Sequence, residues 1–291
     1  MALDKDMRFK LLAAYKGTEY KGWQIQEKTP EPPTIQGSIE KAINKISGLK
    51  IRLYGAGRTD SGVHAIGQCA HFDLPDAAKW RNLDWRHALN ALLPSSIRII
   101  SYENVCDTFH ARKDAILKTY TYDFWTEDKF LPPQYLDFVW NSGPLDLNAM
   151  RACAMLLCGE HDFSSFQNAG TNVESTRRKI YAVEFEELPH APFYPEHAPY
   201  LRMSISANGF LKQMARNIAG FLREAGRGKI SVEEAKYILN VGKRQLMPAP
   251  TAPAKGLCLA KVYYDYAEAE AMLRKIAKQD PLMQKTEKTK S

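Results

Sequence analysis

Apolar residues in the first third of the chain recur with two different periods, and the order of these periods constrains the fold most. Residues 8–15 alternate as a strand that places Phe9, Leu11, Ala13 and Tyr15 on one face. The elements expected next are a helix over 35–46 that ends at Gly48, strands over 50–54 and 66–74, a short helix between Asp84 and Pro94, and a strand over 97–102. This half therefore has the order β-α-β-β-α-β.

The same order begins again at residue 116. The expected elements are a strand over 116–125, a helix over 147–158, strands over 180–186 and 201–207, a helix over 210–225, a helix opened by the capping box Ser231–Glu234, and a strand over 257–264. Two such runs, the second with one added helix, favour an α+β fold of two similar lobes over a parallel doubly wound sheet. A loop or insertion is expected over 188–199, and a frayed tail over 278–291.

The charge balance gives a soft indication of the partner. The chain has 40 Lys and Arg and 33 Asp and Glu, so its net charge is 40 − 33 = +7 and its pI is about 9.0. This balance favours a polyanionic binding partner. With 45% apolar and 25% charged residues, the composition is that of an ordinary globular protein. No stretch approaches the roughly 18 apolar residues of a membrane span and no apolar signal core opens the chain, so the expected compartment is the cytoplasm.

The five cysteines lie mostly in apolar periodic segments, and we interpret them as reduced core thiols. Only Cys153, Cys158 and His161 are close enough in sequence to suggest a metal site. On a helix the two cysteines would point about 140° apart, so they could not share one ion. No metal is therefore expected.

The segment from Gly55 to Gly62, GAGRTDSG, packs three glycines, an arginine and an aspartate into eight residues. Such density indicates a sharp turn or a close approach to the backbone. A dinucleotide fingerprint would need glycine at Asp60 and a helix afterwards, and a P-loop would need Lys-Ser/Thr in place of Val63-His64. Both are rejected. What remains is a turn that presents Arg58 and Asp60, or a purely structural turn in which Asp60 bonds nearby backbone groups.

Residues 57–65, GRTDSGVHA, with Gln68 and His71-Phe72 after them, resemble the active-site motif of the tRNA pseudouridine synthase A family, which more often has Ala where Ser61 stands. Further blocks resemble the same family in the same order. They are YKGTEYKGWQ at 15–24, TIQG at 34–37, NALLP at 90–94, FHAR at 109–112, KTYTY at 118–122, HDFSSF at 161–166, FLKQMARN at 210–217 and TAPAKGL at 251–257.

The resemblance implies two similar ferredoxin-like lobes that form a continuous mixed or antiparallel sheet, with helices packed on it and an active-site cleft between the lobes. It places the lobes at residues 7–108 and 109–266, followed by a helical or frayed basic tail over 267–291. It also implies isomerisation of uridine to pseudouridine at positions 38, 39 and 40 of the tRNA anticodon arm, in a homodimer and without a cofactor. The target base must leave its stack, so an aromatic face and cationic contacts are required.

The same resemblance assigns the site residues. Asp60 is the expected catalytic carboxylate, which either traps ribose C1′ or removes a proton from C2′. Tyr120 is expected to stack on the target base, Arg216 to pair with the aspartate, and Arg58 to meet the RNA backbone. Further contacts to the RNA backbone are expected from four basic residues of the second lobe: Lys212, Arg223, Arg177 and Arg178. Two of them, Lys212 and Arg223, share one stripe of the 210–225 helix with Arg216.

Three other functions are weighed against this one. A non-catalytic RNA-binding relative would be marked by the loss of Asp60, which is present. A glycosidase would need a second carboxylate beside Asp60 to protonate the leaving group, and no motif supplies one. A synthase of the same fold with a different RNA target stays open.

Overall fold

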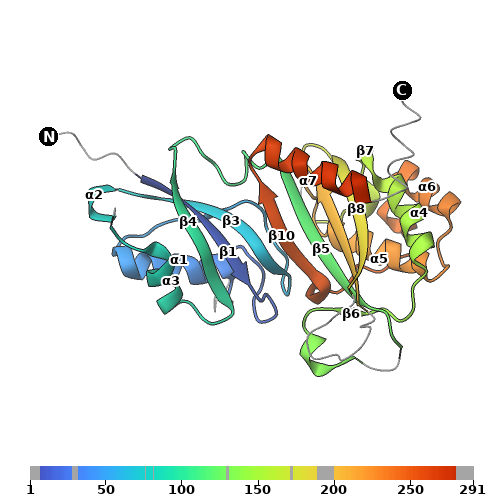
Figure 1. The fold of residues 1–291 in the computed structure, drawn as a ribbon, viewed down its shortest axis with the longest axis horizontal. Coiled ribbons are helices and arrows are strands. Elements are labelled where there is room, and N and C mark those ends of the chain that lie inside the picture. Colours follow the sequence, from blue (N-terminus) through green and yellow to red (C-terminus); the bar gives the residue numbers. More distant parts are fainter. Residues whose placement is uncertain are drawn as a thin grey trace. The chain divides into compact units, whose positions relative to one another are not determined.

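The computed structural model describes residues 7–27, 32–75, 77–80, 82–128, 131–170, 173–188 and 200–279 (Figure 1). The chain divides into two compact units. The first holds the described residues through Ala115 together with Cys258–Val262, and the second holds Ile116–Leu257 and the described residues from Tyr263 onward.

The first unit is a sheet with helices on one face (Figure 1). Its elements are β1 (Met7–Tyr15), α1 (Ile35–Ser47), β2 (Tyr54–Gly55), β3 (His64–Leu74), α2 (Ala77–Trp80), α3 (Trp85–Leu92), β4 (Ile97–Val105) and most of β10 (Leu257–Tyr263). Strand β1 lies between β4 and β3 and is antiparallel to both. The expected face of β1 is confirmed, because Phe9 stacks on Phe72 with ring centroids 5.3 Å apart and Trp85 of α3 packs on both rings.

Strand β10 comes late in the chain but completes the sheet of the first unit. It is parallel to β3, with Cys258 opposite His64 and Leu259 opposite Ala65. The two strands approach closely at Gly67, where a Cβ would lie 2.1 Å from the carbonyl oxygen of Ala260. Glycine is therefore required at this position of β3.

The second unit repeats a sheet with helices. Its elements are β5 (Leu117–Trp125), β6 (Trp140–Asn141), α4 (Leu147–Leu157), β7 (Gly159–Asp162), β8 (Arg177–Leu188), β9 (Tyr200–Ala207), α5 (Met214–Gly226), α6 (Val232–Val241) and α7 (Tyr266–Gln279), with short 3₁₀ turns at Pro133–Tyr135, Ser164–Phe166, Arg244–Leu246 and Ala254–Gly256. The strands β5, β9, β8 and β7 lie in that order and are antiparallel, and β6 is parallel to β5. The α+β class is confirmed.

Side chains of β5 alternate between two faces. Tyr120, Tyr122 and Phe124 share one face and are buried. Leu117 points to the opposite face, where it packs with Tyr263 and with Ala269 of α7.

The prediction of a strand over 50–54 is wrong for all of these residues except Tyr54. Only Tyr54 and Gly55 pair with β3, because side chains of α1 bond the backbone before them. Leu53 donates its N–H to Glu40 Oε1 at 2.8 Å, and Gln36 Nε2 donates to the Leu53 carbonyl at 3.0 Å.

Two further expectations are corrected. The helix expected over 210–225 begins only at Met214, because Gln213 has a φ of +60° that interrupts helical backbone. Cys106 is exposed and is not a core thiol, whereas Cys69 and Cys153 are buried; none of the five cysteines forms a disulfide. Of the insertion expected over 188–199, Leu188 ends β8 and 189–199 lie outside the described residues; of the tail expected over 278–291, Lys278 and Gln279 belong to α7 and 280–291 lie outside them.

No helix in the described part of the chain is both long and apolar enough to cross a bilayer. Within the same residues, no group of three His, Cys, Asp or Glu side chains is placed to hold a metal ion. The ring Nε2 of His161, one of the three residues weighed as metal ligands, lies 3.0 Å from the main-chain carbonyl oxygen of Cys158.

Candidate active site

The glycine-rich segment forms a turn between β2 and β3, as expected. Val63 donates its N–H to the main-chain carbonyl of Asp60 at 3.1 Å. In this turn Arg58 is exposed, Thr59 is buried and Asp60 is half-buried. The first unit therefore presents Arg58 and Asp60 at its surface and holds the residue between them inside.

Two buried side chains of the neighbouring strands, Tyr15 of β1 and Gln68 of β3, form hydrogen bonds with this turn. The hydroxyl groups of Tyr15 and Thr59 share a hydrogen bond of 2.8 Å, and Gln68 Nε2 donates to the carbonyl oxygen of Gly57 at 2.9 Å. Burial raises the pKa of Tyr15, so its hydroxyl stays protonated over the physiological range. The turn is thus tied at Gly57 and Thr59, on the N-terminal side of Asp60.

A second segment, residues 17–23, lies against the other side of the turn. Trp23 donates its N–H to the Thr59 carbonyl at 3.0 Å, and Ser61 Oγ donates to the Tyr20 carbonyl at 3.0 Å. Two glycines allow this approach: a Cβ at Gly17 would lie 2.0 Å from the Val63 carbonyl oxygen, and one at Gly22 would lie 2.7 Å from that of Thr59. The YKGTEYKGWQ block therefore has a steric reason for both glycines.

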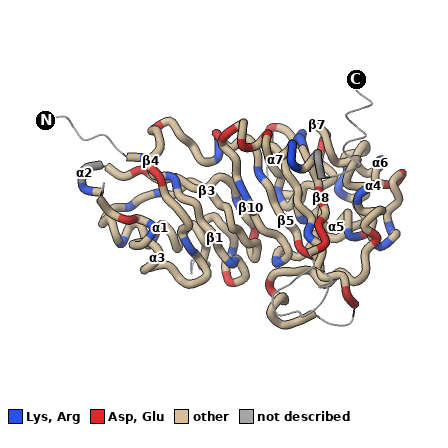
Figure 2. The backbone as a smooth tube through the Cα atoms, viewed as in Figure 1, with Lys and Arg blue, Asp and Glu red and all other residues tan. Residues whose placement is uncertain are grey.

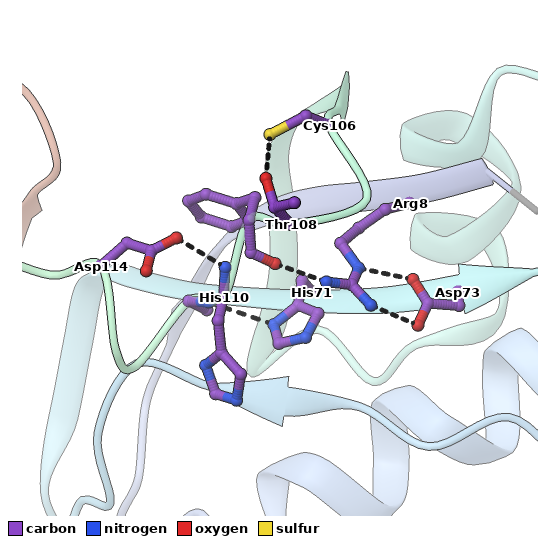
Figure 3. A network of polar contacts seen from close by, with 9 residues as sticks. Arg8, His71, Asp73, Cys106, Thr108, His110 and Asp114 are labelled. Atoms are coloured by element: carbon purple, nitrogen blue, oxygen red, sulfur yellow. Dashed lines mark hydrogen bonds and ion pairs between the residues drawn. The ribbon is translucent and has the colours of Figure 1, made fainter.

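Two further motif blocks meet on the sheet face opposite the helices (Figure 3). Arg8 Nε and Nη2 donate to the Asp73 carboxylate at 2.6 and 2.8 Å, and Arg8 Nη1 donates to the Phe109 carbonyl at 2.7 Å. Ala111 donates its N–H to His71 Nδ1 at 3.2 Å. Burial, aided by the charge of Arg8, lowers the pKa of His71 to about 4, so the ring is neutral at pH 7 and Nδ1 can accept this bond.

The residue expected to stack on the base, Tyr120, lies on β5 of the second unit. Only 7% of its surface is exposed, and the ring of Phe210 meets it edge-to-face with centroids 4.9 Å apart. Tyr122, the next residue on the same face, donates its hydroxyl to the Pro253 carbonyl at 2.8 Å. The tyrosine strand is therefore packed by aromatic rings and by the 251–256 segment.

Arg216 lies in the first turn of α5 and is half-buried. Its Nε donates to the carbonyl oxygen of Ala252 at 2.7 Å. This bond fixes the plane of the guanidinium relative to the helix.

The expected basic stripe on one helix is partly wrong. Lys212 precedes α5, beyond the left-handed Gln213, and its Nζ donates to the Ala169 carbonyl at 2.8 Å. Arg223 does lie on α5, but its guanidinium packs on the ring of Trp140 at 4.5 Å and donates to Glu224 and to the Ser142 carbonyl, which leaves 15% of the side chain exposed. The two residues therefore have different environments.

Arg177 and Arg178 lie at the start of β8. The side chain of Arg177 is 61% exposed and pairs with Glu160 across the strands, with N and O 3.2 Å apart. Arg178 Nη1 donates to the carbonyls of Ser175 and Arg177. Figure 2 shows that, along the described backbone of both units, Lys and Arg are interspersed with Asp and Glu.

Several residues that shape the site were not singled out from the sequence. Gln68 and His71 stood inside the quoted motif, but their bonds to Gly57 and Ala111 join positions that no periodicity relates. Asn217 and Thr251 likewise stood in motif blocks, and their hydrogen bond of 2.6 Å joins two blocks far apart in the chain. The only sequence signal that could have identified these four residues is their presence in the motif blocks.

Comparisons with known proteins agree on one family. The model of a family described as tRNA pseudouridine synthase matches residues 11–112 and 153–265. The tRNA pseudouridine synthase A of Maridesulfovibrio salexigens is 46% identical over 257 residues, which cover 88% of this chain and 90% of that protein. The proteins of the same name from Lawsonia intracellularis and Oleidesulfovibrio alaskensis are 47% and 45% identical, with 88% of this chain and 99% and 96% of theirs covered.

One solved structure, a crystal structure of a Cbf5-Nop10-Gar1 complex, matches with a TM-score of 0.27 and 13% identity over 71% of this chain and 52% of that chain. No argument rests on so low a score.

Proposed function

The chain belongs to the tRNA pseudouridine synthase family and is an isomerase that makes pseudouridine in tRNA, and we propose that its targets are uridines 38, 39 and 40 of the anticodon arm. The observation that carries this proposal is the sequence GRTDSGVHA, in which Asp60 stands on a turn held by Tyr15, Gln68 and the 17–23 segment. The ordered motif blocks and the identity to proteins named tRNA pseudouridine synthase A support the assignment.

The reaction needs a carboxylate beside the ribose. The bond from C1′ to N1 breaks, the base turns, and C1′ bonds to C5; the proton on C5 is lost and N1 gains one, so no oxidant or reductant is required. We assign the carboxylate to Asp60, either as the nucleophile at C1′ or as the base at C2′. The bonds that hold Gly57 and Thr59 would keep this carboxylate in place while the base moves.

The target base must be taken out of its stack, at a cost of a few kcal/mol. We assign the stacking partner to Tyr120 and a contact with the displaced RNA backbone to Arg58. Arg58 is exposed on the same turn as Asp60, which suits a phosphate contact. Arg216 is assigned, from the resemblance, to pair with Asp60.

Contacts to phosphates are proposed for Arg177, Arg178, Lys212 and Arg223. The exposure of Arg177 supports its assignment. Arg223 would first have to exchange its contacts with Ser142 and Glu224 for an RNA phosphate. Cytoplasmic location and assembly as a homodimer are proposed from the family, and light scattering of the purified protein tests the dimer.

The test is to incubate the purified protein with unmodified tRNA and to map pseudouridine by sequencing. We expect product at positions 38 to 40 with the wild type and none with Asp60→Asn or Asp60→Ala, while tRNA binding changes by no more than a few-fold. Asp84→Asn is the matched control, because asparagine still caps α3 and the variant should keep full activity.

Each outcome separates one alternative. Product only at other uridines would show a synthase with a different target. No product with the wild type would leave a non-catalytic RNA-binding relative. Turnover by Asp60→Asn would remove Asp60 as the catalytic carboxylate.

A further inference from the structure

Residues 250–256, here called the strap, connect α6 and its following turn to β10. The strap lies directly against α5. Arg216 Nε donates to the Ala252 carbonyl at 2.7 Å, and Ala252 donates its own N–H to the Arg216 carbonyl at 3.2 Å. A Cβ at Gly220 would lie 1.9 Å from the Pro250 carbonyl oxygen, so only glycine at this position of α5 lets the strap approach.

The strap also contacts β5. The Tyr122 hydroxyl donates to the Pro253 carbonyl at 2.8 Å, and a Cβ at Gly256 would lie 2.6 Å from the Tyr122 ring. Burial raises the pKa of Tyr122, so the hydroxyl remains a donor. Two residues assigned to substrate binding, Arg216 and Tyr120, thus lie on elements that the same strap joins within the second unit.

A buried polar network fixes the strap beside Arg216. Thr251 Oγ1 donates to Asn217 Oδ1 at 2.6 Å, and Asn217, which is 1% exposed, donates to the Phe166 carbonyl at 2.7 Å and to Asn168 Oδ1 at 2.9 Å. Arg244 donates to Asn217 and Thr251 at 3.3 Å. Because every polar atom of Asn217 is bonded, its side chain has one well-defined position.

The same network reaches the start of α5. Asn168 Nδ2 donates to Gln213 Oε1, and Gln213 is the only residue other than glycine with positive φ in the described part of the chain. Non-glycine residues adopt this conformation at a cost, and it persists where surrounding contacts determine it. The first turn of α5 carries Arg216 and Asn217. It is therefore held by the strap on one side and, at its start, by the bond between Asn168 and Gln213.

From this geometry we propose that Thr251 and Asn217 are positioning residues of the synthase. They hold the strap so that the Ala252 carbonyl aligns the guanidinium of Arg216 for its role at the reacting nucleotide. The inference rests on the proposed function, which it deepens. Thr251 and Asn217 themselves need not touch the substrate.

The first test is Thr251→Val, which keeps the shape of the side chain and removes its hydroxyl. We expect the single-turnover rate at saturating enzyme to fall about tenfold, with the Kd for tRNA within twofold of the wild type. Thr251→Ser restores the hydroxyl and should recover most of the rate. The control is Ser165→Ala, which removes a buried hydroxyl bond of 2.8 Å to the Ile238 carbonyl in the same unit and should leave the rate unchanged.

A double-mutant cycle separates positioning from general stability. In an Arg216→Lys background, which has already lost the guanidinium, Thr251→Val should reduce the rate by less than twofold. The NMR signal of the Arg216 Nε–H group provides a readout that does not depend on activity. This signal, assigned by its loss in Arg216→Lys, should be protected from solvent exchange in the wild type and unprotected in Thr251→Val.

A full rate with Thr251→Val, or an equal loss in both backgrounds, would overturn the inference while leaving the proposed function intact. An unchanged Nε–H signal in Thr251→Val would do the same. A wild type that forms no pseudouridine would overturn both.

Discussion

Tyr120 has little exposed surface of its own, and the ring of Phe210 meets it edge-to-face. If it stacks on the flipped base, its aromatic face is needed and its hydroxyl is not. Stacking of a base on an aromatic side chain contributes about 1–3 kcal/mol.

We therefore expect Tyr120→Phe to keep stacking and a substantial part of the activity. Tyr120→Leu should lose at least about tenfold more in kcat/KM, measured by release of tritium from uridine C5. Equal losses in the two variants would remove stacking as the role of Tyr120.

His71 makes the stability of the first unit depend on pH. Its pKa is lowered to about 4 in the folded protein, against about 6.5 in an unfolded chain, so the folded state binds fewer protons between these values. The contribution of His71 is complete above pH 6.5 and is lost as the pH falls toward 4, by at most about 3 kcal/mol.

Urea titrations at a series of pH values should therefore show an unfolding free energy that declines over this window. The decline should be smaller in His71→Asn, whose side-chain oxygen can still accept the Ala111 N–H bond. Above pH 7 the two proteins should have parallel profiles. A decline of equal steepness in the variant would assign the effect to other groups.

At the scale of the elements, the periodicity of the apolar residues predicted which faces of the strands and helices are buried. The alternation of β1 and the isoleucines of α1 specify their buried faces, and Asp84 and Ser231 cap their helices as expected. The predictions failed where side chains replace backbone partners: residues 51–53 bond α1 instead of a neighbouring strand. Likewise, the apolar spacing from Phe210 onward is helical, but Gln213 has a positive φ and its side chain accepts a hydrogen bond from Asn168, 45 residues earlier in the chain.

The candidate site divides in the same way. The types of the functional residues were readable from the motif blocks. The contacts that hold them, such as Tyr15 with Thr59 and Thr251 with Asn217, join distant segments and follow only from the fold.

The close approach of the 17–23 segment to the Asp60 turn can be tested with one methyl group. Gly22 has a φ of +89° and lies where a Cβ would be 2.7 Å from the Thr59 carbonyl. Gly22→Ala should lower the unfolding free energy by about 2 kcal/mol or more and reduce activity, because the Asp60 turn is displaced.

Gly48→Ala is the control for backbone strain alone. Gly48 also has a positive φ of +71°, but no atom lies within 4 Å of the added Cβ. That variant should cost about 1 kcal/mol and keep its activity. Thermal melts and turnover assays distinguish the two, and equal behaviour would exclude a steric effect on the turn.

For the molecule as a whole, the interspersed charge predicts that tRNA affinity depends on a few exposed cations rather than on one block (Figure 2). Each phosphate contact contributes to the decrease of log K with log salt. The double variant Arg177→Gln with Arg178→Gln should reduce that slope by about 1 to 2.

Arg274→Gln is the matched control, because Arg274 is 72% exposed on α7 and pairs with Glu270. Its slope should equal that of the wild type, as measured by filter binding over a range of salt concentrations. An unchanged slope in the double variant would exclude phosphate contacts at the start of β8.

The position of β10 imposes an order on biosynthesis. During translation, β1 through β4 leave the ribosome long before Cys258–Val262, so the edge of β3 at His64 and Ala65 has no β10 to pair with until those residues have been made. Over that interval a nascent chain carries an open strand edge, which invites pairing with other chains. Release of a chain truncated before residue 258 should therefore yield a protein that aggregates through the open edge of β3 in the first unit.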